Sequence, residues 1–309
     1  MKILITGGAG YLGSVFTRNL LKNHEVIVYD NLMYNQTSLV DLSNNPNFTF
    51  HYGDVREWSK LKYLVEQVDI VIPLAALVGF PLCEKDKDLA TSINTTQIQN
   101  IVDVLSNDQM ILYPNTNSGY GTRGKGMVDE TNELTPISHY GKTKCEAEDY
   151  IINESNGISF RLATVFGVSS RMRTDLLVND FANKCLRDGY LVVYQKNFMR
   201  TFIHVKDIAK VFMFAIEHPE EMSGEVYNVG SNSMNHSKGD VCKLIQEKTD
   251  CYVHYADFDG DADKRDYVVS YDKINGLGYD TTISVDEGID ELLRVFPIVQ
   301  MDNKKYKNG

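Results

Sequence analysis

The sequence has 309 residues, 43% of them hydrophobic, which is enough chain for one large α/β domain or two modest ones. Its formal net charge of −11 argues against a nucleic-acid partner, because such a partner requires a basic face. No apolar run approaches the length of a membrane span, and a strand predicted from Lys2 leaves no room for a signal peptide, so we expect a cytoplasmic protein.

The most specific pattern is a strand, a glycine-rich turn and a helix at the start of the chain. The strand is predicted over 2–6 and the helix over 11–23. Gly7 permits the tight turn, Gly10 lets the backbone approach a pyrophosphate, and Gly13 lets the helix pack close to the strand. The free N–H groups and positive dipole end of the helix would then face the phosphates. The pattern predicts a dinucleotide-binding turn.

The second strand, predicted over 25–30, ends in a carboxylate. Asp30 lies 23 residues after Gly7, close to the ~20 expected for the acid that binds the adenine-ribose 2′-hydroxyl. A carboxylate there would repel a 2′-phosphate, so the pattern favours NAD over NADP. The glycine spacing is G-x-x-G-x-x-G, which differs from the G-x-G-x-x-G of the classical fingerprint.

Strands and helices continue to alternate through the first half of the chain. Strands are predicted over 48–52, 69–74, 109–113 and 158–163, and helices over 56–67, 88–106 and 139–155. Repeated βα units predict a parallel, doubly wound sheet. The carboxyl ends of its strands would bring the glycine turn, Asp30, Asp54, Ala75 and Ala76 to one ligand-binding edge.

The alternation loosens after about residue 165. Helices are predicted over 174–188, 206–218, 237–248 and 286–295, and strands over 191–195, 225–229 and 251–255. The acidic loop 256–266 lacks the glycine and glutamate positions of an EF-hand, and 301–309 is predicted to be a solvated tail.

The cysteines and histidines show no metal-binding spacing. Five cysteines are scattered without a C-x-x-C pair, at positions Cys83, Cys145, Cys185, Cys242 and Cys251. Seven histidines show no H-E-x-x-H pattern. We therefore expect reduced thiols and no metal site.

A tyrosine and a lysine in the predicted helix 139–155 are the first candidates for chemistry. Tyr140 and Lys144 are four residues apart and share one helix face. Tyrosine has a pKa of about 10, too high for a base at neutral pH. An ammonium group one turn away and a cationic nicotinamide ring would favour the phenolate and make it a general base. The alternative is an exposed helix with an incidental Tyr and Lys.

Two further segments carry candidate groups. The polar segment 113–121 follows a predicted strand, and a hydroxyl group there could bind a sugar oxygen as it becomes a carbonyl. Arg200 could clamp a phosphate. The alternatives are a polar loop and a surface arginine before a strand.

Seven motifs occur in the order found in the extended short-chain dehydrogenase/reductases, which are nucleotide-sugar epimerases, dehydratases and reductases. They are T-G-x-x-G-x-x-G at 6–13, Asp30, G-D-V at 53–55, L-A-A at 74–76, the Thr/Ser-rich loop ending at 120–121, Y-x-x-x-K at 140–144 and R-x-F-I-H-V-x-D at 200–207. The chain resembles this family over nearly its whole length. The resemblance implies a Rossmann fold with a smaller C-terminal α/β substrate domain, and a homodimer formed through two helices, one of which carries Tyr140.

The resemblance also divides the chain. Residues 1–165 would form the NAD-binding Rossmann domain, with 201–230 returning to it. Residues 166–200 and 231–300 would form the sugar-nucleotide-binding domain.

The resemblance assigns site residues position by position. Tyr140 would be the catalytic base, Lys144 its partner and Thr116 the catalytic hydroxyl. The residues expected to contact NAD are Gly7, Gly10, Tyr11, Leu12, Gly13, Asp30, Asn31, Asp54, Val55, Leu74, Ala75, Ala76, Tyr140 and Lys144. The residues expected to contact the substrate are Val78, Asn117, Ser118, Arg173, Asn179, Arg200 and Arg265, with Arg171 as a further candidate for its diphosphate.

Departures from the family narrow the expected reaction. Sugar-nucleotide 4,6-dehydratases follow the catalytic Thr with Asp-Glu, but this chain has Asn117 and Ser118, which disfavours dehydration. The loops 73–79, 114–121 and 161–167 most resemble GDP-heptose 4-dehydrogenases of capsule polysaccharide biosynthesis. We therefore expect NAD to oxidise the C4 hydroxyl of a GDP-heptose or GDP-hexose.

Two alternatives remain at this stage. The first is a nucleotide-sugar 4-epimerase that keeps NAD tightly bound. The second is a non-catalytic sensor of NAD or a sugar nucleotide, although such proteins usually lose the Tyr–Lys pair.

Overall fold

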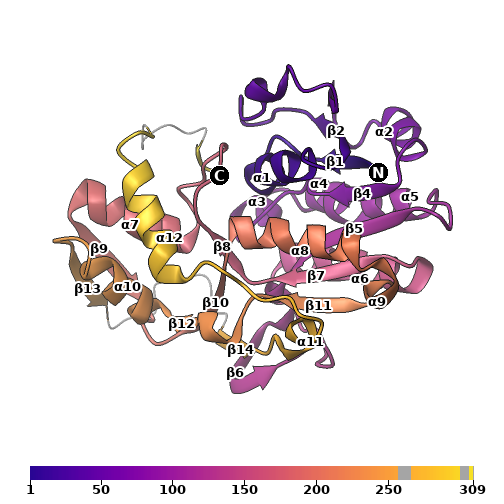
Figure 1. Ribbon diagram of the computed structural model, residues 1–309. Helices are drawn as coiled ribbons and strands as arrows, with labels where there is room; N and C mark the ends of the chain where they lie inside the picture. Colours follow the sequence, from indigo (N-terminus) through magenta and orange to yellow (C-terminus); the bar gives the residue numbers. More distant parts are fainter. Residues whose placement is uncertain (257–265, 300–305, 309) are drawn as a thin grey trace.

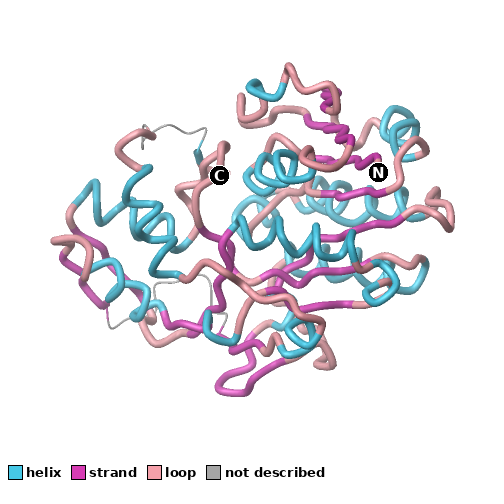
Figure 2. The backbone as a smooth tube through the Cα atoms, in the orientation of Figure 1, coloured by secondary structure: helices cyan, strands magenta, loops and turns pink. Residues whose placement is uncertain are grey.

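The computed structural model describes residues 1–256, 266–299 and 306–308. A large sheet with helices on both faces forms one part, and a smaller group of helices and short strands lies beside it (Figures 1 and 2). Residues 306–308 lie where the two parts meet: Tyr306 packs against the core of the smaller part, and Asn308 lines a cavity with residues of the large sheet.

The large sheet has seven strands, and every neighbouring pair is parallel. Its order is β11-β7-β5-β4-β1-β2-β3. The strands are β1 (Lys2–Thr6), β2 (Glu25–Asp30), β3 (Phe48–Tyr52), β4 (Ile70–Pro73), β5 (Met110–Thr116), β7 (Ile158–Leu162) and β11 (Val226–Val229). This confirms the predicted α/β fold. The strand order reverses at β1, so the ligand-binding crevice is expected at the carboxyl ends of β1 and β4.

Two layers of helices cover the sheet. On one face, α1 (Tyr11–Leu20) packs against α8 (Val205–Glu217), where the rings of Phe16 and Phe212 lie 4.6 Å apart. On the other face are α2 (Trp58–Val65), α5 (Gln97–Val102) and α6 (His139–Glu154). Apolar residues on both faces of the strands explain the near-continuous hydrophobic runs from which they were predicted.

The helix predicted over 88–106 is wrong in its continuity and its end. The chain instead forms α4 (Lys87–Thr91), a π-helical turn η2 (Ser92–Thr96) and α5, which ends at Val102. Within η2, the Asn94 side chain accepts a hydrogen bond from the Leu77 N–H at 2.9 Å and donates to the Leu77 carbonyl at 3.0 Å. The turn therefore holds the loop that follows β4.

Short strands and three long helices form the smaller part. The strands are β8 (Thr164–Phe166), β10 (Met199–His204) and β12 (Asn235–Ser237) in one sheet, and β9 (Tyr190–Tyr194) with β13 (Tyr252–Ala256) in another. A further pair, β6 (Thr122–Val128) with β14 (Asp266–Val269), packs Val128, Tyr267 and Val269 into the core of the large part instead. The helices are α7 (Leu177–Asp188), α10 (Lys238–Gln246) and α12 (Val285–Val295). The remaining elements are α3 (Phe80–Lys85), α9 (Pro219–Met222), α11 (Asp272–Gly276), η1 (Val40–Leu42), η3 (Asn117–Tyr120) and η4 (Asn232–Met234). The division into two domains stays a prediction.

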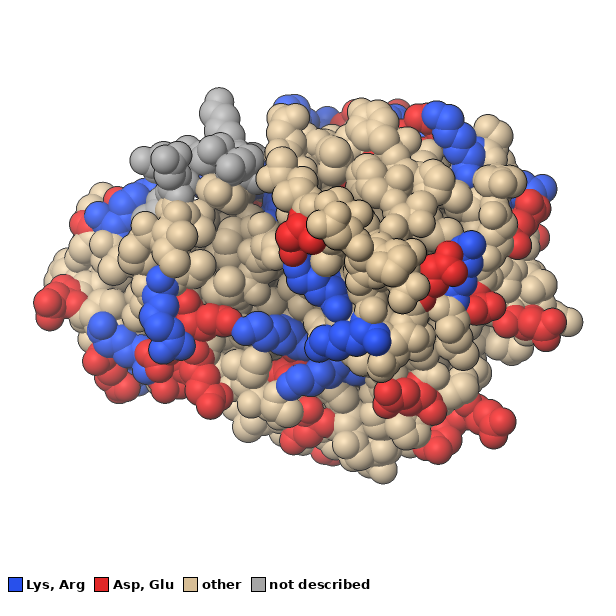
Figure 3. Space-filling model, turned by 45° about the horizontal axis from the view of Figure 1, so that its top comes forward, with Lys and Arg blue, Asp and Glu red and all other residues tan. Residues whose placement is uncertain are grey.

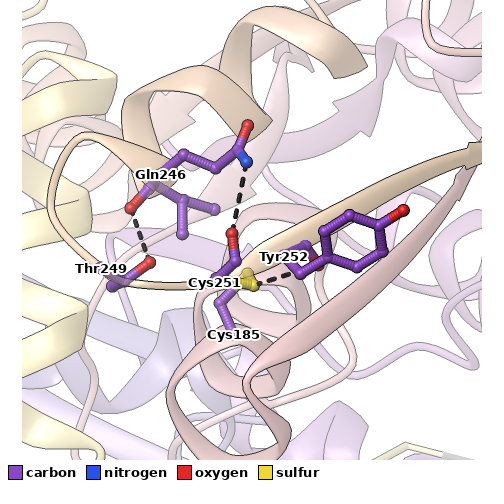
Figure 4. The surroundings of a disulfide bond; sticks show 6 residues. Cys185, Gln246, Thr249, Cys251 and Tyr252 are labelled. Atoms are coloured by element: carbon purple, nitrogen blue, oxygen red, sulfur yellow. Dashed lines mark hydrogen bonds between the residues drawn. A yellow bond between two sulfur atoms is a disulfide. The ribbon is translucent and has the colours of Figure 1, made fainter.

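A disulfide links Cys185 near the end of α7 to Cys251 just before β13, with their Cα atoms 5.1 Å apart (Figure 4). The expectation of five reduced thiols is therefore wrong for this pair. The cysteines are 66 residues apart, and the parallel pairing of β9 with β13 brings their flanking segments together. Cys83, Cys145 and Cys242 are not in disulfides. Cysteine usage no longer indicates a reducing compartment.

The predicted solvated tail is wrong for Tyr306, which packs against the core of the smaller part. Its carbonyl accepts a hydrogen bond from the Thr174 N–H at 2.9 Å. Most of the acidic loop (257–265), with Arg265, and residues 300–305 and 309 lie outside the described residues.

Charges of both signs are interleaved on the face shown in Figure 3, where a row of Lys and Arg is flanked by Asp and Glu. Within the described ranges, no helix is long and apolar enough to cross a membrane.

Candidate active site

A cavity of about 750 Å³ opens at the carboxyl ends of the parallel strands. It brings the three predicted catalytic residues, Thr116, Tyr140 and Lys144, together with the glycine turn. The other predicted cofactor contacts all line the same cavity, and they are Gly7, Gly10, Tyr11, Leu12, Gly13, Asp30, Asn31, Asp54, Val55, Leu74, Ala75 and Ala76.

The glycine turn is tight enough to require glycine at two of its positions. Gly7 has φ +70°, and a Cβ there would lie 2.6 Å from the Ala75 backbone nitrogen. A Cβ on Gly13 would lie 2.4 Å from the Gly7 carbonyl oxygen. No side chain in the described part of the chain caps the start of α1 at Gly10. The first N–H groups of α1 are thus suited to a phosphate ligand, as NAD would supply.

Asp30 is fixed against this turn. One carboxylate oxygen accepts a hydrogen bond from the Ala9 N–H at 2.9 Å, and the other accepts one from the Leu32 N–H at 2.8 Å. Burial raises the pKa of Asp30, whereas these backbone donors lower it. The carboxylate is therefore held in place at the end of β2, where a ribose hydroxyl could donate to it.

Asp54 lines the neighbouring part of the wall. Its carboxylate pairs with Arg56 at 2.9 Å, and this interaction lowers the pKa of Asp54 to about 2. The Asn31 side chain also donates to it at 3.3 Å. Asp54 is thus a charged acceptor beside Asp30.

Helix α6 begins at a fixed point, which places Tyr140 in its first turn. The Ser138 hydroxyl caps the helix by accepting the Gly141 N–H at 3.1 Å. The preceding turn is held by Glu84 of α3, whose carboxylate accepts the His139 N–H at 3.1 Å. Tyr140 also packs against the small apolar cluster of Leu77, Cys83 and Ala90.

Lys144 is almost completely buried, with 4% of its surface exposed. Its ammonium group lies 3.9 Å from the centre of the Tyr113 ring, where a cation–π interaction partly replaces water. Burial lowers the pKa of Lys144 to about 7. A proton on this group is therefore easily gained or lost near neutral pH, and ribose hydroxyls or a phenolate would stabilise its charge.

Replacing Lys144 with methionine is expected to stabilise the NAD-free protein by at least about 1 kcal/mol at pH 7. Between the folded pKa of about 7 and the unfolded value of 10.5, only the unfolded chain holds this proton. The free energy of unfolding of the wild-type protein therefore increases as the pH rises through this range. The stability difference between Lys144→Met and wild type becomes smaller as a result. Urea unfolding across this pH range measures the effect, with exposed Lys142→Met as the control. A constant difference would contradict the prediction.

Thr116 and Ser118 present adjacent hydroxyl groups to the cavity. The Thr116 hydroxyl donates to Ser118 Oγ at 2.9 Å and accepts the Ser118 N–H at 3.1 Å. Asn117, between them, is buried and does not line the cavity. Its amide instead donates to the Thr201 and Tyr271 hydroxyls at 3.3 and 3.2 Å.

The predicted substrate contacts within the described residues divide into those that line the cavity and those that, like Asn117, do not. Val78, Ser118 and Arg173 line the cavity. Asn179 and Arg200 are buried away from its wall, and Asn179 donates to the carbonyls of Gly167 and Arg173. Arg265 lies outside the described residues.

A buried ion pair near the predicted catalytic residues was not predicted from the sequence. Glu148 of α6 accepts hydrogen bonds from Arg161 of β7 at 2.8 and 3.0 Å. It also accepts one from Asn115 at 2.6 Å, and the Asn115 side-chain oxygen accepts the Thr116 N–H at 2.8 Å. The pair joins α6, the helix of Tyr140, to β7, and the Asn115 side chain links Glu148 to β5, the strand of Thr116. Its only sequence signal is that Glu148 lies one turn after Lys144 on the same face.

Comparison with known proteins is consistent with this geometry. The model of the NAD dependent epimerase/dehydratase family matches residues 3–230. A UDP-glucose 4-epimerase of Lactobacillus helveticus is 25% identical over 261 residues, covering 75% of this chain and 77% of the relative. A dTDP-D-glucose 4,6-dehydratase of Mus musculus is 24% identical over 311 residues, covering 93% and 86%.

A crystal structure of UDP-glucuronic acid 4-epimerase from Bacillus cereus, in complex with UDP-glucuronic acid and NAD, has a similar fold. Its TM-score is 0.85 at 25% identity, and the match covers 96% of this chain and 99% of that one. The similarity therefore extends over both parts of the molecule.

Proposed function

The chain belongs to the NAD-dependent epimerase/dehydratase family, and we propose that it oxidises the C4 hydroxyl group of a nucleotide-diphospho-sugar. Its cofactor is NAD. The observation that carries the proposal is the single cavity lined by Thr116, Tyr140 and Lys144 together with the glycine turn and Asp30.

The catalytic residues divide the proton transfer between them. The Tyr140 phenolate takes the proton from the C4 hydroxyl, and the Lys144 ammonium stabilises the phenolate. The Thr116 hydroxyl holds the sugar oxygen as it becomes a carbonyl. The glycine turn and Asp30 would hold NAD⁺, which would supply the acceptor for the C4 hydride. The products are a 4-keto sugar and NADH, with the proton on Tyr140.

Dehydration is disfavoured by the residues after Thr116. Elimination of water across C5–C6 needs an acid and a base beside the sugar. Asn117 is an amide turned away from the cavity, and Ser118 is a hydroxyl bonded to Thr116. Neither supplies the required proton chemistry, although dTDP-glucose dehydratases are among the relatives.

The net reaction follows from what happens to the 4-keto sugar. If the 4-keto sugar is released, the protein is a dehydrogenase. The resemblance of three loops to GDP-heptose 4-dehydrogenases then supports GDP-heptose or GDP-hexose as its substrate and capsule polysaccharide biosynthesis as its role. Return of the hydride to the opposite face would make it a 4-epimerase with tightly bound NAD, and the UDP-glucose 4-epimerase relatives support this second candidate. The family resemblance also supports a homodimer that includes α6.

Incubation with a panel of UDP-, dTDP- and GDP-linked hexoses and GDP-heptose tests the proposal. We expect a product that either lacks two hydrogen atoms or has the same mass with an inverted C4 centre, as read by mass spectrometry and NMR. The first identifies a dehydrogenase and the second an epimerase. Loss of water, or no reaction of any sugar by NAD-loaded protein, would contradict the proposal; the latter would favour a sensor.

A further inference from the structure

An arginine from the second half of the chain lies in the cofactor side of the cavity without an adequate partner. Arg171, between β8 and α7, is 3% exposed and lines the cavity. Its guanidinium carbon lies 4.5 Å from the centre of the Tyr34 ring, which also lines the cavity. Its Nε has no hydrogen-bond partner among the described residues. Such a buried, charged donor is costly unless a ligand accepts its hydrogen bond.

The segment around Arg171 is fastened across the start of α1. The Ser169 hydroxyl donates to the Tyr11 carbonyl at 2.7 Å and lies 2.8 Å from the Ser14 hydroxyl. The Tyr11 hydroxyl donates to the Gly167 carbonyl at 2.7 Å. Because a diphosphate binds where a helix begins after a glycine turn, these contacts place the segment beside that position.

Asp175 and Asp30 act on Arg171 electrostatically, but among the described residues neither is hydrogen-bonded to its guanidinium group. Arg173 forms two hydrogen bonds with Asp175, at 3.0 and 2.6 Å. The nearby Asp30 carboxylate already accepts the Ala9 and Leu32 N–H groups. An anionic ligand between Arg171 and the start of α1 would therefore meet positive charge from both sides.

The C-terminal residues support the segment from outside. The Thr174 N–H donates to the Tyr306 carbonyl at 2.9 Å, and Arg171 Nη2 donates to the Lys307 carbonyl at 3.5 Å. Asn308 lines the cavity, and its side-chain oxygen is buried without a hydrogen-bond partner in the described part of the chain. A second unsatisfied polar atom thus lies on the same wall.

We propose that Arg171, stacked on Tyr34, binds the diphosphate of NAD, and that the segment 167–175 retains the cofactor. The inference rests on the proposed NAD-dependent function. It differs from the expectation that Arg171 binds the diphosphate of the sugar nucleotide. The Arg171 guanidinium can donate two parallel hydrogen bonds to a phosphate in a planar fork, a geometry that a lysine ammonium does not reproduce.

The test compares NAD binding by wild type, Arg171→Met, Arg171→Lys and the matched control Arg187→Met, whose side chain pairs with Asp188 outside the cavity. NAD is stripped and its Kd measured by calorimetry, and the NAD retained through purification is quantified. Loss of a charge-assisted contact is expected to weaken NAD binding about 10- to 100-fold in Arg171→Met and less in Arg171→Lys. Arg187→Met should bind NAD as wild type does.

The same titrations with UDP and GDP separate the competing outcomes. If Arg171→Met bound NAD as wild type does but bound UDP or GDP more weakly, Arg171 would belong to the substrate site and the inference would be overturned. Unchanged affinity for both NAD and the nucleotides would overturn it as well. If wild type itself bound no NAD, the proposed function would fail instead. If circular dichroism shows that Arg171→Met does not fold, Arg171→Lys becomes the deciding variant. Wild-type affinity of Arg171→Lys for NAD would then overturn the inference.

Discussion

Replacing Tyr140 with phenylalanine is expected to lower kcat about 1,000-fold while NAD remains bound. The substitution removes one hydroxyl group, and general-base catalysis contributes about 10²- to 10⁴-fold to a rate. The ring still packs against Leu77, Cys83 and Ala90, so the start of α6 is kept. Each tenfold loss corresponds to about 1.4 kcal/mol of transition-state stabilisation, so the expected loss is about 4 kcal/mol.

The measurement is the rate of NADH formation or sugar interconversion with the substrate found in the panel. The NAD content of the purified variant shows that the cofactor site is intact. Tyr63→Phe, an exposed tyrosine on α2, is the matched control and should retain full activity. Turnover near the wild-type rate in Tyr140→Phe would remove Tyr140 from its assigned role.

Replacing Arg161 with methionine is expected to destabilise the fold by about 3–5 kcal/mol. Arg161 and Glu148 have side chains only 8% and 4% exposed, and they form several hydrogen bonds with each other. Removing the cation leaves a buried carboxylate whose charge has lost its partner. Because Glu148 also holds Asn115 beside Thr116, the catalytic geometry should loosen as well.

Urea unfolding measures this loss, and a second substitution identifies its cause. Adding Glu148→Gln to Arg161→Met removes the stranded charge and should restore part of the stability. Lys62→Met breaks an exposed pair with Glu66 and is expected to cost at most about 0.5 kcal/mol. Equal stability of Arg161→Met and wild type would show that the pair contributes little to the fold.

Strands of five or six residues with a clear apolar pattern could be predicted well from sequence. The strands 2–6, 25–30 and 48–52 occur with the predicted bounds. The first two are buried apolar runs, and the third alternates apolar with polar residues as an edge strand does. Strands β8 and β12, with three residues each, are too short for such a pattern. They form because tertiary contacts place them beside β10.

The residues expected to contact NAD could be grouped from sequence motifs, and they line one cavity, because they are close in sequence or follow a strand end. The other contacts form through tertiary packing, and residue spacing gives at most a weak signal for them, such as the position of Glu148 one turn after Lys144. Arg171 meets Tyr34 across 137 positions, and Arg161 meets Glu148 through the packing of α6 on β7. The π-helical turn at 92–96 also has no sequence signal that distinguishes it from an α-helix.

The bonds from Tyr11 and Ser14 to Gly167 and Ser169 span 155 to 158 residues, and this separation bears on how the protein folds. Contacts between such distant positions form slowly, because a long loop must close first. The start of α1 can fold early with its neighbouring strands. The segment with Gly167 and Ser169, which packs over it, is synthesised only after half of the chain. NAD that binds the covered site would therefore stabilise a late folding step and slow unfolding rather than speed the first collapse.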